Sequence, residues 1–361
     1  MQETINNRIH TFASLGDHMR QTANALRLND QATHQLPDLP RHLYQAALRT
    51  ANHNPWFTTG EIARTFEALS DMLRTSVLNK WVGRYPGLGK EISTPRKVIV
   101  IMAGNIPLVG FHDMLCVLMS GHCFSGKLST QDDQLPVAVA DVLTALDASL
   151  VDRIEMSARH SKKADAVIAT GSNNSARYFE YYFANTPHII RKNRNSAALL
   201  SGNESTQDLE LLGMDIFSYY GKGCRNISLL LLPGDFDLNR LLKAWELYRY
   251  VLENKKYLHN LLYHKAFLKA NVTPFTDAGH ILLRENPELA SPVPVLHYWF
   301  YKDFTEAAQI INKYQDRLQC LASKHDHNLG AVDMVAFGET QHPAPWNYAD
   351  GIDTMEFLLR M

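Results

Sequence analysis

One cysteine of this sequence lies in a segment suited to nucleophilic chemistry. Cys224 stands in Gly-Lys-Gly-Cys-Arg-Asn, residues 221–226, which leads into an apolar run. The glycines allow a substrate to approach the backbone closely, and the neighbouring Lys222 and Arg225 would favour a thiolate, the form that attacks a carbonyl carbon. The same residues also fit a tight turn with two solvent-facing cations, so the local sequence leaves both interpretations open.

The other three cysteines are predicted to be structural. Cys116 and Cys123 lie among apolar residues, and Cys320 is expected on the buried face of a helix. Their spacing forms neither a metal-binding pair nor a disulfide framework, so free thiols are expected. His325 and His327 are the nearest approach to a metal-ligand pair, but a solvated loop is the expected role, and no metal site is predicted.

A carbonyl under attack needs hydrogen-bond donors fixed in place for its developing negative charge, and Asn105 could supply one. It follows an apolar run within Ala-Gly-Asn-Ile-Pro, where an Asn serving only the turn is the alternative. Gly171 and Ser172 lie between an expected strand and an expected helix, a position that suits a phosphate. Lys127 could contact a ribose or a phosphate, although a lone lysine is more often solvated.

These residues are separated by segments whose patterns alternate between strand and helix. Buried strands are expected at 97–102, 123–128, 164–170, 188–191, 197–200 and 227–232, and helices at 109–120, 175–183 and 208–220. Helices with breaks are expected before residue 90, and Asp237 is expected to cap one long helix that runs towards Leu262. Such alternation predicts an α/β protein with an open, mostly parallel sheet.

Length and charge narrow the class of protein further. The 361 residues favour two domains, and a formal charge of -1 from 36 basic and 37 acidic residues gives no field to hold nucleic acid or an anionic bilayer. We expect no secretory signal and no membrane span, because the longest apolar run is far shorter than the roughly 20 residues that a bilayer requires. A cytoplasmic protein with small-molecule or protein partners is expected.

In order and spacing, the motifs resemble those of the aldehyde dehydrogenase superfamily, and within it the LuxC-type long-chain acyl-CoA reductases. The resemblance runs from about Lys97 to the carboxyl end. Gly-Asn-Ile-Pro at 104–107 resembles the turn that carries the oxyanion-binding Asn, and Gly-Lys-Gly-Cys at 221–224 resembles the nucleophile motif. The segments Lys-Asn-Arg-Asn-Ser (192–196) and Asp-Gly-Ile-Asp-Thr (350–354) resemble LuxC-type signatures.

The resemblance also implies roles for individual residues. It makes Cys224 the acyl-accepting nucleophile and Asn105 an oxyanion donor. The remaining implied contacts are with the cofactor: Lys127 and Ser129 on the adenosine side, Gly171 and Ser172 at a phosphate, and Glu288 near the nicotinamide ribose, on the basis of Glu-Leu-Ala-Ser-Pro-Val at 288–293.

Two departures from the superfamily pattern bear on the activity. Oxidising members carry a general-base Glu that activates water, whereas the corresponding segment 191–196 has no carboxylate, which favours a reductase. Ala290 stands where the superfamily has a Phe beside the cofactor, and the chain is shorter than a typical member. These departures leave open the oligomerisation arm, the acyl tunnel and the details of cofactor binding.

The sequence therefore predicts an aldehyde-dehydrogenase-like α/β protein with a Rossmann-like cofactor domain (1–200 and 330–361), a helical N-terminal segment, and an α/β catalytic domain (201–329) that carries Cys224. The expected activity is reduction of an acyl-CoA or acyl-protein thioester to an aldehyde with NADP, or alternatively NAD. A homo-oligomer and an acyl-activating synthetase partner are expected. The rival hypotheses are an oxidising aldehyde dehydrogenase, a cofactor-independent Cys acyltransferase or thioesterase, and a non-catalytic binding protein.

Overall fold

The chain forms two compact units, each with its own sheet. The computed structural model describes residues 2–28, 36–89, 94–157, 164–325 and 332–361. Unit 1 comprises residues 1–193 and 342–361, and unit 2 comprises residues 194–341. The expected division lay at residues 200 and 330. The observed one keeps β6 (Asn195–Leu199) and β12 (Met334–Val335) in unit 2, because both strands pair with β11 (Leu318–Ser323).

Unit 1 is built on a five-stranded parallel sheet of order β3-β2-β1-β4-β5. Its strands are β1 (Lys97–Ile101), β2 (Cys123–Lys127), β3 (Ile154–Ser157), β4 (Ala166–Thr170) and β5 (His188–Arg191). The helices of this unit are α1 (Gln2–Arg27), α2 (Asp38–His53), α3 (Thr59–Met72), α4 (Thr75–Val82), α5 (Phe111–Ser120), α6 (Leu135–Leu146), α7 (Asn173–Tyr182) and α12 (Thr354–Leu359), with short 3-10 turns at 148–153 and 349–351.

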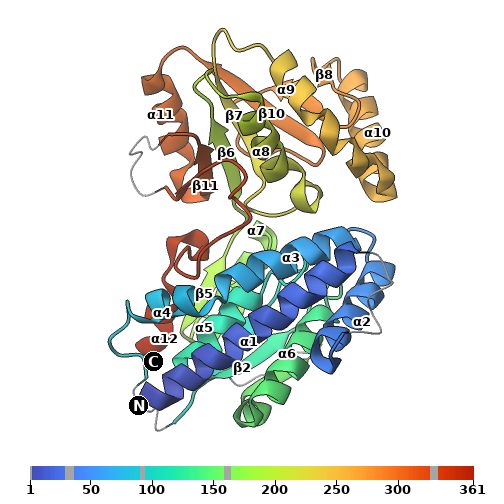
Figure 1. Ribbon diagram of the computed structural model, residues 1–361. Coiled ribbons are helices and arrows are strands. Elements are labelled where there is room, and N and C mark those ends of the chain that lie inside the picture. Colours follow the sequence, from blue (N-terminus) through green and yellow to red (C-terminus); the bar gives the residue numbers. More distant parts are fainter. Residues whose placement is uncertain (1, 29–35, 90–93, 158–163, 326–331) are drawn as a thin grey trace. The chain divides into compact units, whose positions relative to one another are not determined.

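Strand β1 shows why the sheet is buried on both faces. Val98 and Val100 belong to the large core shared with α1, α3, α5 and α6, whereas Ile99 and Ile101 pack in the opposite core beside Phe179 of α7. Alternate side chains of a strand point to opposite faces, so an uninterrupted apolar run requires cover on both sides. The helical N-terminal segment supplies part of that cover on one face (Figure 1).

Unit 2 contains a seven-stranded sheet of order β12-β11-β6-β7-β10-β9-β8, in which only the β8–β9 pair of the described strands is antiparallel. The remaining strands are β7 (Ile227–Pro233), β8 (Thr276–Asp277), β9 (Leu282–Glu285) and β10 (Val295–Tyr301). The helices are α8 (Thr206–Phe217), α9 (Asn239–Ala244), α10 (Lys255–Ala270) and α11 (Phe304–Tyr314), with 3-10 helices η3 (Ser218–Gly221), η4 (Trp245–Glu253) and η5 (Gln315–Arg317).

The expected strands and helices of unit 1 are confirmed, but two expectations for unit 2 were wrong. The long helix from Asp237 is in fact α9, η4 and α10. The Asn254 side chain ends the irregular stretch by accepting the N–H groups of Lys256 and Tyr257, which starts α10. Cys320 lies on the buried strand β11 and not on a helix. Within the described residues, no helix combines the length and apolar character needed to cross a bilayer.

Candidate active site

Cys224 lies in a turn of unusual backbone conformation that joins α8 to β7. Tyr219, Tyr220 and Gly221 have φ angles of 51°, 56° and 76°. A residue with a side chain costs of order 1–3 kcal/mol in such a conformation, so the surroundings must hold this turn in shape. Strain of this kind is concentrated at functional sites, and the half-buried Cys224 follows it by three residues.

Asn226 supplies the restraint. Its buried side chain accepts the N–H of Gly223 at 2.7 Å and donates to the carbonyl oxygens of Asp215 and Ser218, both at 2.9 Å. The carboxylate of Asp215 accepts in turn from the backbone N–H groups of Gly338 (2.7 Å) and Thr340 (3.1 Å). The turn that carries Cys224 is therefore tied both to α8 and to the segment that follows β12.

Replacing Asn226 with alanine is expected to lower the free energy of unfolding of unit 2 by about 2–4 kcal/mol, because it leaves buried backbone groups without partners. Chemical denaturation measures the effect. As a matched control we choose Asn203→Ala at an exposed loop position. A loss no larger for Asn226→Ala than for this control would contradict the prediction.

A second contact reaches Cys224 from the neighbouring strand. The Oγ of Ser196 donates to the Cys224 carbonyl oxygen at 2.9 Å, accepts the N–H of Cys320 at 3.3 Å, and lies 3.2 Å from the Cys320 Sγ. The pairing of β6 with both β7 and β11 is irregular at this point. An irregular ladder leaves backbone groups for side chains to satisfy, and Ser196 does this beside Cys224.

The buried cysteines have shifted acidities. Burial raises the pKa of Cys320 to about 11, although the Arg225 charge lowers it. Burial and the nearby Asp113 also raise the pKa of Cys116. Both groups are therefore thiols near neutral pH, which makes them poor nucleophiles.

Of the two cations beside Cys224, Arg225 is buried and Lys222 is half-buried. The Nη2 of Arg225 lies 3.3 Å from the Oδ2 of Asp333, and Arg225 is buried. The pKa of Lys222 is lowered by burial and then by the charge of Lys256. Lys222 therefore loses its positive charge more easily than Arg225 does. The Asp333 carboxylate partly balances the charge of Arg225.

The segment that carries Glu288 packs against the turn that carries Cys224, within unit 2. Ser228 Oγ donates to the Leu289 carbonyl at 2.6 Å, and a Cβ added to Gly221 would lie 3.4 Å from a methyl carbon of Val293. Residues of both segments, together with residues of β6, α8 and α10, line a cavity of about 40 Å³, which has room for a few water molecules and not for a long acyl chain. The Glu288 carboxylate is exposed and lies 3.6 Å from Lys313 Nζ.

In unit 1, Asn105 and the predicted cofactor residues lie at one edge of the sheet. Asn105 follows β1, Lys127 ends β2 and Ser129 follows it, and Gly171 and Ser172 follow β4. The carboxyl ends of parallel strands lie at the same edge, and the strand order reverses direction between β1 and β4. Ligands of open α/β sheets bind outside this edge at such a switch point.

Two of these loops touch. A Cβ added to Gly104 would lie 2.3 Å from the Ser129 Oγ, so only glycine lets the loop of Asn105 approach the loop of Ser129. At β4, Ser172 is the N-cap of α7 and accepts the N–H of Ser175 at 3.2 Å. The N–H of Gly171 donates to the Arg191 carbonyl at 3.3 Å, so this group extends the sheet.

The segment 191–196, which has no carboxylate, begins with the buried cation Arg191. The Nη1 of Arg191 donates to Asp113 Oδ2 at 2.5 Å, and its Nη2 donates to Thr354 Oγ1 at 2.8 Å. Burial lowers the pKa of Arg191, but the Asp113 carboxylate outweighs burial, so the net shift is upward. The contact joins the segments 191–196 and 350–354, both singled out in the sequence.

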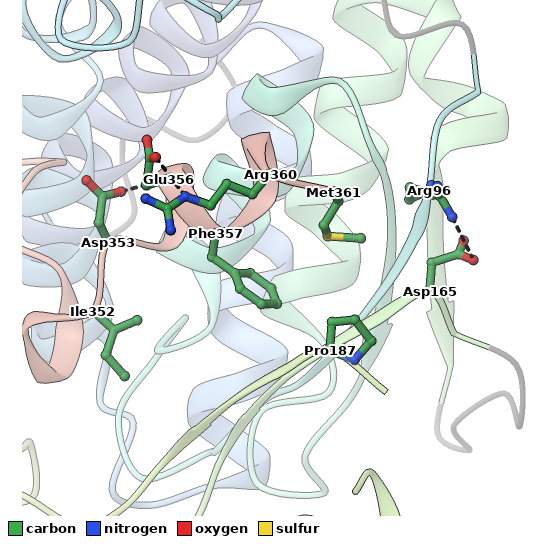
Figure 2. Close-up of a pocket in the computed structure, with 9 residues that line it drawn as sticks. All are labelled: Arg96, Asp165, Pro187, Ile352, Asp353, Glu356, Phe357, Arg360 and Met361. Atoms are coloured by element: carbon green, nitrogen blue, oxygen red, sulfur yellow. Dashed lines mark hydrogen bonds and ion pairs between the residues drawn. The ribbon is translucent and has the colours of Figure 1, made fainter. Parts of the chain in front are cut away.

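A larger hollow lies at the opposite edge of the unit 1 sheet, where β1, β4 and β5 begin. It measures about 650 Å³ (Figure 2). It is lined by Arg96, Asp165, Pro187, Ile352, Asp353, Glu356, Phe357, Arg360 and Met361. Its charges pair with each other: Arg96 with Asp165 at 4.0 Å and Arg360 with Glu356 at 2.9 Å. None of the predicted site residues lines it.

Sequence reasoning missed several residues that shape the site: Ser196, Asn226, Asp215, Asp132 and Arg191. The asparagine directly after Arg225 carried a signal, because Asn is typical of side-chain contacts within turns. The His325 of the weak histidine pair is described, whereas His327 lies outside the described residues. Within the described part of the chain, no group of three or more His, Cys, Asp or Glu side chains is placed to hold a metal ion.

The fold is that of the aldehyde dehydrogenases. Solved structures similar to this chain include aldehyde dehydrogenase 21 of Physcomitrella patens in complex with succinate (12% identity, TM-score 0.63, 100% of this chain and 89% of that one). Another is the indole-3-acetaldehyde dehydrogenase of P. syringae with NAD+ (15% identity, TM-score 0.58, 93% of this chain and 81% of that one). A third is the Bacillus cereus aldehyde dehydrogenase with NAD+ (12% identity, TM-score 0.60, 93% of this chain and 81% of that one). At these identities the likeness establishes the fold. A comparison with curated proteins found no match.

Within this fold, the sequence defines a narrower group. The family model described as acyl-CoA reductase (LuxC) matches residues 7–235, well over half of the chain. The chain belongs to this family, which confirms the expected relationship. The match begins in α1, so it also includes the helical N-terminal segment, which lies before the motifs that carry the resemblance.

Proposed function

We propose that this protein reduces an acyl thioester to an aldehyde through an acyl group held on Cys224, with NADP or NAD as the cofactor. The observation that carries the proposal is the half-buried Cys224 in a turn restrained by Asn226 and Ser196, in a chain of the LuxC acyl-CoA reductase family. Membership in this family supports an oxidoreductase. The turn holds the Cys224 thiol in place and leaves it partly exposed. Acyl-CoA and acyl-protein thioesters are the proposed substrates, the latter supplied by an acyl-activating synthetase.

The residues of the chain divide the work as follows. The Cys224 thiolate attacks the acyl carbonyl carbon, the bond to the leaving thiol breaks, and that thiol takes up a proton. The Asn105 amide and the Cys224 backbone N–H donate to the oxyanion. When bound, a reduced nicotinamide would supply the hydride for the acyl group. Cys224 would hold that group during the transfer and regain its thiolate when the aldehyde leaves. Overall, acyl thioester, NAD(P)H and a proton give aldehyde, free thiol and NAD(P)+.

The carboxyl edge of unit 1 fits a nucleotide. Gly104 brings the Asn105 loop against Ser129, and α7 follows Ser172, its N-cap, with the partial positive charge of a helix N-terminus. Lys127 and Ser129 would contact the adenosine side, Gly171 and Ser172 a phosphate, and Glu288 the nicotinamide ribose. For Gly171 the proposed contact excludes its N–H, which already donates to Arg191.

The lack of a carboxylate in the segment 191–196 favours reduction over oxidation. An oxidising enzyme needs a carboxylate to activate the water that releases the acid. Here the segment 191–196 carries no carboxylate and begins with Arg191, whose guanidinium is held by Asp113 and Thr354. A guanidinium cannot accept a proton from water, so this segment offers no base for hydrolysis of the acyl group on Cys224.

The decisive experiment incubates the protein with acyl-CoAs of increasing chain length, with and without NADPH or NADH. Intact mass detects acyl-Cys224, and aldehyde release is measured in parallel. The proposal requires acylation without cofactor and aldehyde only with it. Turnover to free acid without cofactor would instead indicate a thioesterase, and cofactor binding with no acylation would indicate a binding protein.

Replacing Asn105 with alanine is expected to slow aldehyde formation about a hundredfold, because loss of one oxyanion donor costs roughly 3 kcal/mol in the transition state. The effect should fall on kcat, since the donor acts mainly on the charged transition state. Steady-state kinetics with a saturating reduced cofactor measure it. Asn174→Ala, on the exposed first turn of α7, serves as the control. Full activity of the Asn105 variant would remove this residue from the mechanism.

A further inference from the structure

Asp132, which no motif of the sequence singled out, is a buried carboxyl group beside the Asn105 loop. It lies in the turn after β2, is 3% exposed, and accepts the N–H of Leu108 with its Oδ2 at 2.7 Å. Its Oδ1 is also buried and has no hydrogen-bond partner among the described residues. Burying a carboxyl group without satisfying both oxygens is costly, so its position calls for a role.

The partner of Asp132 is a strained residue. Leu108 has a φ of 54°, in the left-handed region that side chains other than those of Gly, Asn and Asp rarely adopt. Such a conformation persists only where the surroundings determine it. The bond from Leu108 to Asp132 is a restraint of this kind, because it fixes the Leu108 N–H relative to β2.

Asn105 therefore lies between two anchors on the same turn. On its amino side, Gly104 packs against Ser129 with no room for a Cβ. On its carboxyl side, the N–H of Leu108 donates a hydrogen bond to the Asp132 carboxylate. The turn itself is held from the helical N-terminal segment, since Asn54 Nδ2 donates to the carbonyl of Gln131 at 3.1 Å.

The charge state of Asp132 indicates which substitution would keep its hydrogen bond to Leu108. Burial raises its pKa to about 7, although the Leu108 N–H acts in the opposite direction. The group is therefore partly protonated near neutral pH. An asparagine at this position keeps an oxygen that can accept from Leu108 and matches the neutral form in shape.

We propose that Asp132 is a positioning residue that fixes the Asn105 loop for oxyanion stabilisation, through its hydrogen bond to Leu108. This inference rests on the proposed function, because it assumes that Asn105 acts on the acyl carbonyl. It adds that the turn carrying the cofactor residue Ser129 and the loop carrying the oxyanion donor are one structural unit. Loss of the bond releases the loop without removing the amide.

The test measures the rate at which an octanoyl- to hexadecanoyl-CoA series acylates Cys224, by rapid quench and intact mass. Asp132→Ala should slow acylation by about 10- to 100-fold, as small displacements of catalytic groups do. Asp132→Asn should retain most of the rate. Asp133→Ala, at the adjacent exposed position, is the matched control and should behave as the wild type. Circular dichroism and thermal melting check folding, and Asp132→Ser gives a second disruptive variant if Asp132→Ala does not fold.

A double-mutant cycle separates positioning from general destabilisation. If Asp132 acts through Asn105, the Asp132→Ala/Asn105→Ala protein should be no slower than Asn105→Ala alone. Multiplicative losses, or a wild-type rate for Asp132→Ala, would overturn the inference and leave the proposed function intact. A wild-type rate for Asn105→Ala would instead overturn the oxyanion assignment, and the inference with it.

Discussion

Replacing Cys224 with serine is expected to lower the rate of aldehyde formation by on the order of 10⁴-fold or more, as loss of a covalent nucleophile does in other enzymes. A serine hydroxyl remains protonated near neutral pH, whereas a cysteine can supply thiolate. Aldehyde release and oxidation of the reduced cofactor measure the loss, and intact mass should show no acyl adduct. Nucleotide affinity should be unchanged, because the predicted nucleotide contacts other than Glu288 lie in unit 1.

Cys123→Ser is the matched control for this prediction. Cys123 is half-buried at the start of β2, whereas Cys116 and Cys320 are fully buried and have raised pKa values. The Cys123 variant should keep its activity and its acyl adduct. An adduct that survives in Cys224→Ser, or equal activity of the two variants, would refute the assignment of the nucleophile.

Replacing Arg191 with alanine is expected to lower the free energy of unfolding of unit 1 by about 3–5 kcal/mol, because it leaves the buried Asp113 carboxylate without its cation. Both side chains are 5% exposed, so water cannot take over the pairing. Thr354 also loses its donor, which loosens the attachment of α12. Calorimetry or denaturant titration, followed by signals from each unit, measures the effect.

Two further variants distinguish an unpaired charge from a simple loss of packing. The double variant Asp113→Leu/Arg191→Met removes both charges and should recover more than half of the lost stability. Arg177→Ala, on the exposed face of α7, should change stability by less than about 0.5 kcal/mol. If Arg191→Ala proved no worse than Arg177→Ala, the ion pair would have no structural importance.

The central strands of the two sheets were predicted from the sequence, whereas β3, β8, β9, β10 and β12 were not. The apolar runs that became β1 and β7 are buried almost throughout, and residues 188–191 were expected as a strand and are β5. In a parallel sheet covered on both faces, burial demands continuous apolar residues, and this demand is visible in a single sequence. The helix expected at 109–120 ends at Ser120, and Gly121 follows it with a φ of 92°.

The errors arose where one local signal competed with another. Asp237 was expected to cap one helix that runs towards residue 262, but Asn254 caps a new helix, α10, within this stretch. The pattern around Cys320 has too few residues to distinguish a buried strand from the buried face of a helix. The segment of Cys320 forms a strand because it pairs with β6, which is distant in sequence.

The candidate site was predictable as far as the chemistry of single residues allows. Cys224 and Asn105 could be proposed because a thiol or an amide on a glycine-rich turn has a recognisable use. The groups that hold them could not be proposed. Ser196 reaches the Cys224 carbonyl across 28 positions, and Asp132 reaches Leu108 across 24. Such contacts depend on strand order and loop packing, which a single sequence does not specify.

The division of the chain has a consequence for biosynthesis. Unit 2 is one uninterrupted segment inserted into unit 1, and residues 342–361 return to complete unit 1, where Met355 and Leu358 are fully buried. A nascent chain emerges from the ribosome in sequence order, so unit 2 can fold while the first 193 residues still lack their last helix. The incomplete unit 1 would expose apolar surface during that interval, and it is the part of the protein that we expect chaperones to engage.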